Sequence, residues 1–392
     1  MQGFFAGTSA VLRRELKRIA TQPIYLVLTV VLPLVSFVFF AMLFEKGIAR
    51  NMPIAVLDND HSDLSRKITT MIDQTPAAMV SFEVQDMTEA ERLMREGRIY
   101  AVVLIPYDFE KNILSNRQTD LNAYITGSNI TANGLLSKDI QTAVTTFSAG
   151  IQIQLLTKQG LTERQAMAQL MPVRFMRHIL FNPYTNYGYY LAPSFMPMML
   201  LIFTIMSTIF TIGVELKRST AGEWLSTARG SVLAAVAGKL LPITVMMFAV
   251  ALTMFVVLFR VVGVPLNGSL CMLIFGSLLF ILSYQAIGMM IVALMANMRL
   301  ALSLGGGYSV LAFTFSGLTF PIMAMSTAMQ ALSRLFPFTY YTDLIVDQTM
   351  RGAPAIYSAA DLCYISLFIL VPMLTLPRLR RICTDEKFWG KL

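Results

Sequence analysis

The chain of 392 residues carries 31 Lys or Arg and 23 Asp or Glu, which gives a formal net charge of +8. Only 14% of its residues are charged and 55% are hydrophobic, whereas a soluble domain carries about 25% charged residues. Together with a mean hydropathy of +0.61, this composition excludes a disordered chain, a disulfide scaffold and an ordinary soluble enzyme. It also argues against nucleic-acid binding, which needs basic residues clustered on a soluble surface. An integral membrane protein with room for one further domain remains.

The first 22 residues are predicted to form an amphipathic helix on the membrane surface. Apolar side chains recur at helical spacing and basic ones surround them: Leu12, Leu16 and Ile19, with Arg13, Arg14, Lys17 and Arg18. This pattern is typical of an interfacial helix. The uncharged apolar run 24–44 follows and is long enough to cross a bilayer core, which predicts a first span at 23–44. Because no small-residue cleavage site follows, we expect a retained anchor rather than a signal peptide.

The polar segment 45–190 alternates between strand and helix patterns. The expected strands are 53–57, 78–84, 99–105, 121–125 and a returning strand at 173–181. The expected helices are 62–74, a helix opened by the capping-box spacing of Thr88 and Glu91 and running toward Arg95, 108–115, and 130–170 with a break near Gly160. The pattern predicts an inserted α/β or α+β domain.

One acidic run in this segment has two interpretations, and it consists of Asp58, Asp60, His61 and Asp63. These residue types bind metals, but Asp, Asn and Ser are also ordinary turn and N-cap residues after a strand. We favour the turn. The second histidine, His178, has no partner at a useful spacing, and the sequence contains no HExxH, CxxC or GxSxG motif. We therefore predict no catalytic residue and no metal site.

Five further apolar segments predict a total of six transmembrane helices: 191–214, 240–259, 270–295, 302–325 and 359–376. The last four spans lie within 240–376, with an outer segment at 326–358 and a tail at 377–392. Lys and Arg accumulate on the cytoplasmic side of short loops. Fourteen basic residues lie on the side of the two termini and three on the opposite side, outside 45–190. Both termini are therefore expected inside, and the segment 45–190 outside.

The spans offer no energy source of their own. Ion-coupled transporters place ionisable residues inside their spans, but the cores of these six contain none, and Tyr284 and Gln285 are the most polar residues there. The sequence also lacks a GxxxxGK[ST] phosphate loop. The chain is therefore either a passive device or the membrane part of a two-component machine.

The inner loop 215–239 favours the second alternative, the membrane part of a two-component machine. It places charges around a threonine that could cap a short helix, and it contains Glu215, Lys217, Arg218, Thr220, Glu223 and Trp224. Trp224 and Leu225 are expected to form an apolar edge that docks into a groove of a partner. The alternative is a solvated turn with a tryptophan that anchors it to the membrane.

Three local patterns, together with this layout, resemble a known family. The external segment opens with PIAVLDND at 53–60 and SDLSR at 62–66, the inner loop runs from 215 to 225, and LFPFTYY at 335–341 precedes Arg351-Gly352. Over nearly its whole length the chain resembles an ABC-2 type permease, in the branch with a large external domain between the first two spans. The inner loop resembles the coupling helix of that family, in which a Gly-Thr pair precedes Glu; here Ser219 replaces the glycine.

The resemblance implies a complex of two permeases, identical or paralogous, with two copies of an ATP-binding-cassette ATPase. ATP and Mg²⁺ would bind the ATPase, and this chain would hold no cofactor. The resemblance assigns coupling to Glu215, Lys217, Arg218, Thr220, Glu223 and Trp224, and a re-entrant outer hairpin to the segment with Pro337, Tyr340, Tyr341 and Gly352. Tyr284 and Gln285 are expected to line the path.

Members of this branch export drugs, lipids or other amphiphiles across the bacterial inner membrane. Some of them work with a periplasmic adaptor and an outer-membrane channel. Two other classes stay open from the residues alone: a membrane-anchored sensor whose external domain binds a ligand, and a passive channel.

Overall fold

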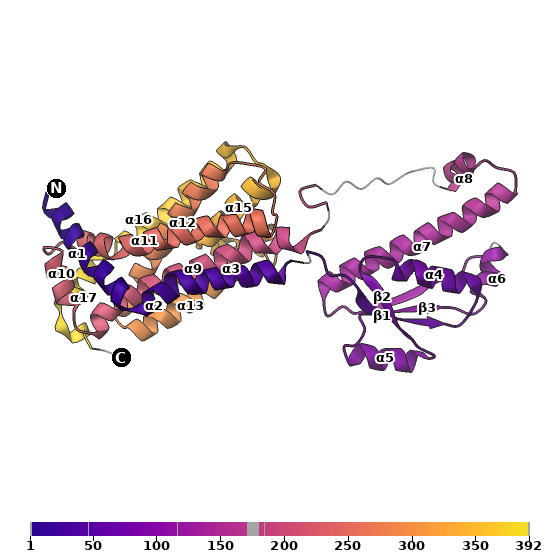
Figure 1. Cartoon of the computed structure of the whole chain (residues 1–392), viewed down its shortest axis with the longest axis horizontal. Coiled ribbons are helices and arrows are strands. Elements are labelled where there is room, and N and C mark those ends of the chain that lie inside the picture. Colours follow the sequence, from indigo (N-terminus) through magenta and orange to yellow (C-terminus); the bar gives the residue numbers. More distant parts are fainter. Residues whose placement is uncertain (1, 46, 116, 171–179, 184, 391–392) are drawn as a thin grey trace. The chain divides into compact units, whose positions relative to one another are not determined.

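The computed structural model describes residues 2–45, 47–115, 117–170, 180–183 and 185–390. The chain folds as two units (Figure 1), a sheet unit of Ile48–His178 and a helical unit of Met1–Gly47 and Ile179–Leu392. The strand expected at 173–181 falls almost entirely outside the described residues.

The helical unit contains the apolar segments. Its helices are α1 Gln2–Thr21, α2 Pro23–Leu26, η1 Val27–Val31, α3 Leu32–Leu43, α9 Tyr187–Lys217, α10 Ala221–Thr227, α11 Val232–Val256, η2 Val257–Val261, α12 Leu270–Met295, α13 Met298–Thr314, η3 Ile322–Ala324, α14 Thr327–Ser333, α15 Pro337–Val346, η4 Asp347–Arg351, α16 Ala355–Met373, α17 Leu376–Thr384 and η5 Glu386–Phe388. Within the described residues, five stretches are long and apolar enough to cross a membrane: Pro23–Leu43, Tyr187–Lys217, Val232–Val261, Leu270–Met295 and Ala355–Thr384.

The fifth predicted span differs from the structure. Helix α13 has 17 residues, which at 1.5 Å per residue gives a length of about 26 Å. The predicted end at residue 325 is wrong, because the chain leaves the helix after Thr314 and passes through Gly317, whose φ is +87°. Pro321 follows and lacks the N–H that a continuing helix needs.

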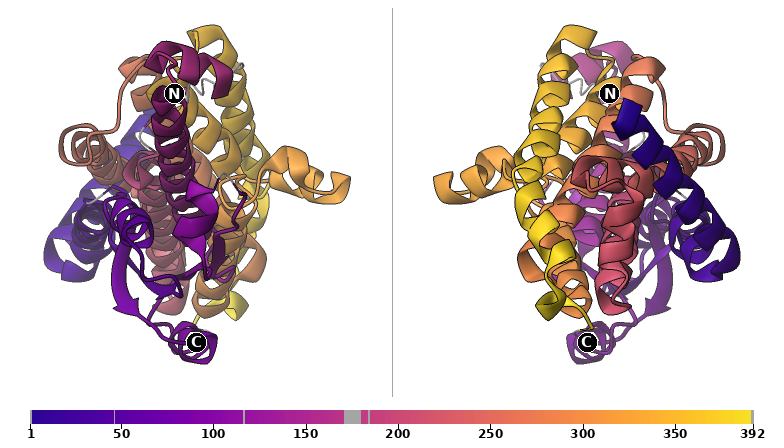
Figure 2. Two further views of the ribbon diagram at one scale, coloured as in Figure 1. Left: turned by 90° about the vertical axis from the view of Figure 1, so that its right-hand side faces the viewer. Right: turned by 90° about the vertical axis from the view of Figure 1, so that its left-hand side faces the viewer.

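Helix α9 forms the centre of the helical unit. It packs against α3, α11, α12, α13 and α15, and Leu200, Ile205 and Ile209 on it are completely buried. At one end of the bundle, α1, α10 and α17 gather (Figure 1). The short α14, light orange in Figure 2, projects from the side of the bundle and buries only Ser333.

The sheet unit contains β1 Met52–Asp58, α4 Asp63–Asp73, β2 Ala78–Glu83, α5 Met87–Arg95, β3 Ala101–Ile105, α6 Phe109–Leu114, β4 Asn122–Ile125, α7 Ile130–Lys158 and α8 Glu163–Leu170. The strand order is β2-β1-β3-β4. Strand β1 runs parallel to β2 and β3, and β4 is antiparallel to β3. The strands and helices expected between 53 and 170 are thus confirmed, and the parallel strands decide in favour of α/β.

Helices cover both faces of this sheet, as Figure 1 shows for α4 and α7 on one face and α5 on the other. Ile54 and Val56 of β1 pack with the α4 and α7 side, whereas Ala55 and Leu57 pack with the α5 side. Successive strand residues point to opposite faces, so a strand buried on both faces is apolar throughout. This explains the uninterrupted apolar run of β1.

The capping box predicted at Thr88 is wrong by two residues. Asp86 is the N-cap of α5, and its Oδ1 accepts the backbone N–H of Glu89 at 2.7 Å. Thr88 lies inside the first turn of the helix.

Candidate coupling site

The inner loop forms the short helix α10. Ser219 adopts φ +57° before it, a left-handed conformation that costs a residue with a Cβ about 1–2 kcal/mol and costs glycine little. This explains physically why glycine suits this position in the family that the loop resembles. Thr220 occupies the N-cap position, but the predicted cap is wrong, because its hydroxyl donates to Glu215 instead of accepting from the helix.

The two faces of the loop differ in exposure. Lys217, Arg218 and Glu223 are exposed, whereas Ala221 and Trp224 are buried. The apolar edge expected at Trp224 and Leu225 is wrong, since Trp224 is only 1% exposed and Leu225 is also buried. Helix α10 therefore exposes its polar edge and packs its apolar side against the rest of its own chain.

Trp224 fixes α10 against the start of α11. Its indole Nε1 donates to the carbonyl of Ala235 at 3.2 Å. The Nζ of Lys239 lies 5.1 Å from the centre of its ring, a cation–π distance. A buried tryptophan with its N–H bonded in this way holds the orientation of the helix that carries it.

Beneath α10 lies a cluster of five charged side chains from α1, α9 and α11, the buried charge cluster. It consists of Arg14, Glu15, Arg18, Glu215 and Lys239. The Lys239 Nζ lies 2.6 Å from Glu15 Oε1 and 2.7 Å from Glu215 Oε1. The Arg14 Nη2 lies 3.0 Å from Glu215 Oε2, and Arg18 also pairs with Glu215.

The members of the buried charge cluster depend on one another. Glu15, Glu215 and Lys239 are 0% exposed, and a buried charge that loses its partner costs about 3–5 kcal/mol. Burial opposes the charged form of Arg18, but the carboxylates of Glu215 and Glu15 outweigh it and raise its pKa. The cluster therefore ties α1, the end of α9 and the start of α11 into one rigid support for α10.

Of the five cluster members, only Glu215 is among the predicted coupling residues. Arg14 and Arg18 are predicted as part of the interfacial helix, Lys239 as one of the basic residues on the inner side, and Glu15 has no predicted role. A signal existed for the last two: Glu15 is the lone acid of a basic amphipathic helix, and Lys239 stands inside an otherwise apolar segment. A long-range pairing of such residues cannot be deduced from their spacing, because 224 positions separate them.

The two residues expected to line a path lie on α12. Tyr284 is completely buried, and its ring packs against Phe280 with centroids 4.9 Å apart. Gln285 is 3% exposed, and its Oε1 accepts from the hydroxyl of Thr244 at 2.8 Å. Both side chains are packed between helices in this structure.

The outer segment contacts neighbouring helices through its aromatic residues. Pro337 is the first residue of α15. The hydroxyl of Tyr341 lies 2.6 Å from that of Ser277, while Tyr340 stacks on Tyr364 with ring centroids 4.9 Å apart. Gly352 ends η4 with φ +62°. Helix α15 is thereby fixed to α12 and α16.

In the sheet unit, the acidic run after β1 is a turn. Asp58 accepts the backbone N–H groups of Asp60 and His61 and the hydroxyl of Ser65. Asp63 pairs with Arg66. No group of three metal-binding side chains occurs in the part of the chain that the structure describes.

Asp60 has a separate role as the cap of a neighbouring helix. Its carboxylate accepts the backbone N–H groups of Phe109 at 2.9 Å and Glu110 at 3.0 Å, at the start of α6. Partial burial opposes its ionised form, but hydrogen bonds from Ser62 and from these two N–H groups outweigh burial and lower its pKa. Asp60 thus supplies the cap that Asp108, at the N-cap position, does not.

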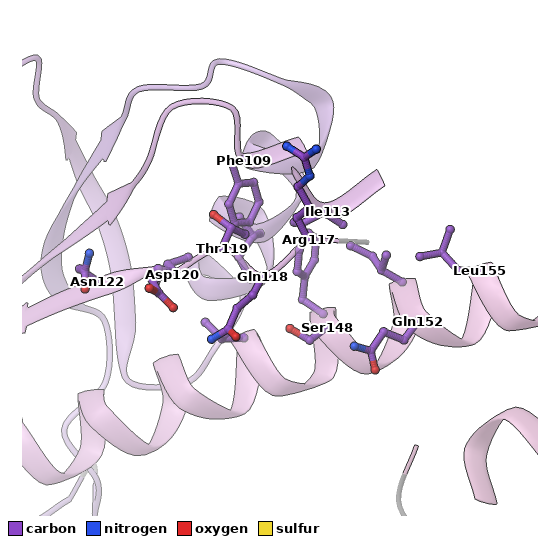
Figure 3. A pocket seen from close by; sticks show the side chains of 15 residues that line it. Phe109, Ile113, Arg117, Gln118, Thr119, Asp120, Asn122, Ser148, Gln152 and Leu155 are labelled. Carbon is purple, nitrogen blue, oxygen red and sulfur yellow. The ribbon is translucent and has the colours of Figure 1, made fainter. Parts of the chain in front are cut away.

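A hollow of 640 Å³ lies in the sheet unit between α7 and the segment that joins α6 to β4 (Figure 3). Phe109, Ile113 and Phe147 contribute apolar surface, and Arg117 and Asp120 contribute charge. Several of its lining residues, Arg117 and Asp120 among them, are exposed. It is a surface hollow rather than an enclosed cavity.

Comparison with known sequences decides the family. The sequence profile of the ABC-2 family transporter proteins matches residues 23–376. The chain belongs to the ABC-2 transporter family.

Two Escherichia coli K12 proteins of this kind are similar to the chain. The probable multidrug ABC transporter permease YbhS is 24% identical over 353 residues, which cover 86% of this chain and 87% of YbhS. The probable multidrug ABC transporter permease YbhR is 21% identical over 345 residues, which cover 87% of this chain and 89% of YbhR. Its family and its apolar helices make this ABC-2 chain a multi-pass membrane protein.

Proposed function

We propose that the chain is the permease subunit of an ATP-driven exporter that moves amphiphilic or drug-like molecules outward. A separate ATP-binding-cassette ATPase, present in two copies, binds ATP and Mg²⁺ and supplies the energy. Two permeases, identical or paralogous, form the path, and the chain itself is not an enzyme. The proposed location is the bacterial inner membrane, with six spans, both termini inside and the sheet unit outside.

One observation supports this proposal most directly: in a member of a transporter family, the short surface helix α10 packs on the buried charge cluster. The end of α9 exposes Lys217 and Arg218, and α10 exposes Glu223. The buried charge cluster connects its base to α9 and α11, both candidate spans. When an ATPase moves α10, this rigid connection passes the motion directly to two membrane helices, so the motion is not absorbed by a flexible loop.

The substrate class rests on similarity, because YbhS and YbhR are named as probable multidrug permeases. The outer hairpin around α15 is proposed to close the path on the outer side, and Tyr284 and Gln285 to face it when the helices separate. A periplasmic adaptor and an outer-membrane channel are proposed as further partners of the sheet unit.

ATP-dependent transport in inside-out vesicles tests this function. Vesicles with the chain and its ATPase should accumulate a fluorescent amphiphile when ATP and Mg²⁺ are added, and should not do so with a non-hydrolysable ATP analogue. Accumulation without ATP would identify a passive channel. If the sheet unit bound a ligand while the vesicles showed no flux under either condition, the chain would be a sensor.

A further inference from the structure

Within the segment 377–392, which is expected as a tail, the described residues pack onto the coupling site. Helix α17 buries Leu379, Ile382 and Cys383 and packs against α10, α11 and α12. The turn η5 follows it and leads to Trp389. The last described residues therefore lie against the inner loop of the same helical unit.

The ring of Trp389 lies so close to position 222 that a residue without a Cβ, glycine, is needed there. A Cβ added to Gly222 would lie 2.9 Å from Cη2 of Trp389, closer than real Cβ contacts come. The indole Nε1 of Trp389 donates to the carbonyl of Ile382 at 3.0 Å. This bond fixes the orientation of the ring on α17. Turning the ring away from position 222 would break the bond.

Gly390 binds the end of α9, on the other side of the turn at Ser219. Its backbone N–H donates to the carbonyl of Leu216 at 3.0 Å, in the last turn of α9. Its φ is +68°, which a glycine adopts without strain. Trp389 and Gly390 thus contact α10 and α9 on the two sides of the turn at Ser219.

Helix α10 needs such a support because it has only seven residues. Isolated helices shorter than about 12–15 residues are marginal in water, so packing sets the direction of α10. The buried charge cluster and Trp224 support it on one side, and the contacts of Trp389 and Gly390 support it on another.

We propose that Trp389 and Gly390 form a clasp that positions α10 for its ATPase, with Trp389 as the positioning residue. This rests on the proposed function, since it assigns a second support to the same coupling site. The clasp touches neither substrate nor nucleotide, and it acts through the orientation of α10.

A suppressor test uses the tight fit between positions 222 and 389. Gly222→Ala should displace the ring and lower the number of molecules transported per ATP by about tenfold, within the loss that a misplacement of about 1 Å can cause. Trp389→Ala should cause a similar loss, and Trp389→Phe should retain most of the coupling. In the Trp389→Ala background, Gly222→Ala should have no further effect. Glu386→Ala, an exposed change in the same turn, is the matched control.

A second readout follows the ring itself. The chain has two tryptophans, and Trp224 is buried, so acrylamide quenching of the purified full chain reports mainly on Trp389. Gly222→Ala should increase quenching, while Glu386→Ala should not.

Two outcomes overturn the clasp: unchanged coupling in Trp389→Ala, or a loss from Gly222→Ala of the same size in both backgrounds. The amount of ATPase that co-purifies separates the two proposals. If the wild-type chain binds no ATPase, the proposed function fails together with the clasp. If it binds the ATPase and the variants transport normally, only the clasp fails.

Discussion

The replacement Lys239→Met tests the buried charge cluster. Lys239 is 0% exposed and is the closest partner of Glu15, at 2.6 Å. Without it, Glu15 keeps only Arg18, at 3.6 Å, and its second oxygen already has no partner among the described residues. Removing one partner of a buried ion pair costs about 3–5 kcal/mol, which is roughly a 100- to 4,000-fold change in the ratio of folded to unfolded protein.

Thermal unfolding in detergent, followed by far-UV circular dichroism, measures this effect. We expect the Tm of Lys239→Met to fall by on the order of 10 °C. Lys217→Met is the matched control, because Lys217 is exposed, and its Tm should not change. Adding Glu15→Gln to Lys239→Met should restore part of the loss, because it removes the carboxylate that has lost its closest partner. Equal Tm values for Lys239→Met and Lys217→Met would refute this reasoning.

Three further predictions concern single positions. Glu223→Ala should uncouple ATP hydrolysis from transport without lowering Tm, because Glu223 is exposed; unchanged transport per ATP would remove it from the coupling edge. Ser219→Gly should stabilise the chain by about 1 kcal/mol, because glycine relieves the left-handed strain, and a lower Tm would contradict that explanation. The lowered pKa of Asp60 means that its contribution to stability is present above the unfolded pKa, about 3.9, and is lost as the pH falls through the folded pKa. In hydrogen exchange of the full chain, Asp60→Asn should therefore reduce protection of the Phe109 and Glu110 amides at pH 7, and this deficit relative to the wild type should shrink below pH 4; equal protection at pH 7 would contradict the cap.

The sheet unit was largely predictable because its signals are local. Apolar runs bounded by turn residues placed β1, β2 and β3 within about two residues. The errors occurred where two local signals compete: Asp86 caps α5 in place of Thr88. Similarly, Gly317 and Pro321 interrupt an apolar run that hydropathy alone extends to residue 325.

The position of the short helix α10 was predictable from the sequence, but its supports were not. The pattern of charges around Trp224 located the helix, yet it predicted an exposed apolar edge where the structure buries Trp224 and Leu225. Its supports come from residues 15, 239 and 389, which are distant in sequence and meet only when α1, α11 and the end of the chain pack together. No periodicity within the loop contains that information.

Photo-crosslinking from two exposed positions tests the central claim, that α10 receives the motion of an ATPase. A crosslinking amino acid is placed at position 223 on α10 or at position 334, next to α14, in cells that contain the ATPase; both positions are exposed. The account predicts that position 223 captures the ATPase subunit and position 334 does not. Capture from position 334 alone, or from neither position while ATP-dependent transport continues, would contradict it.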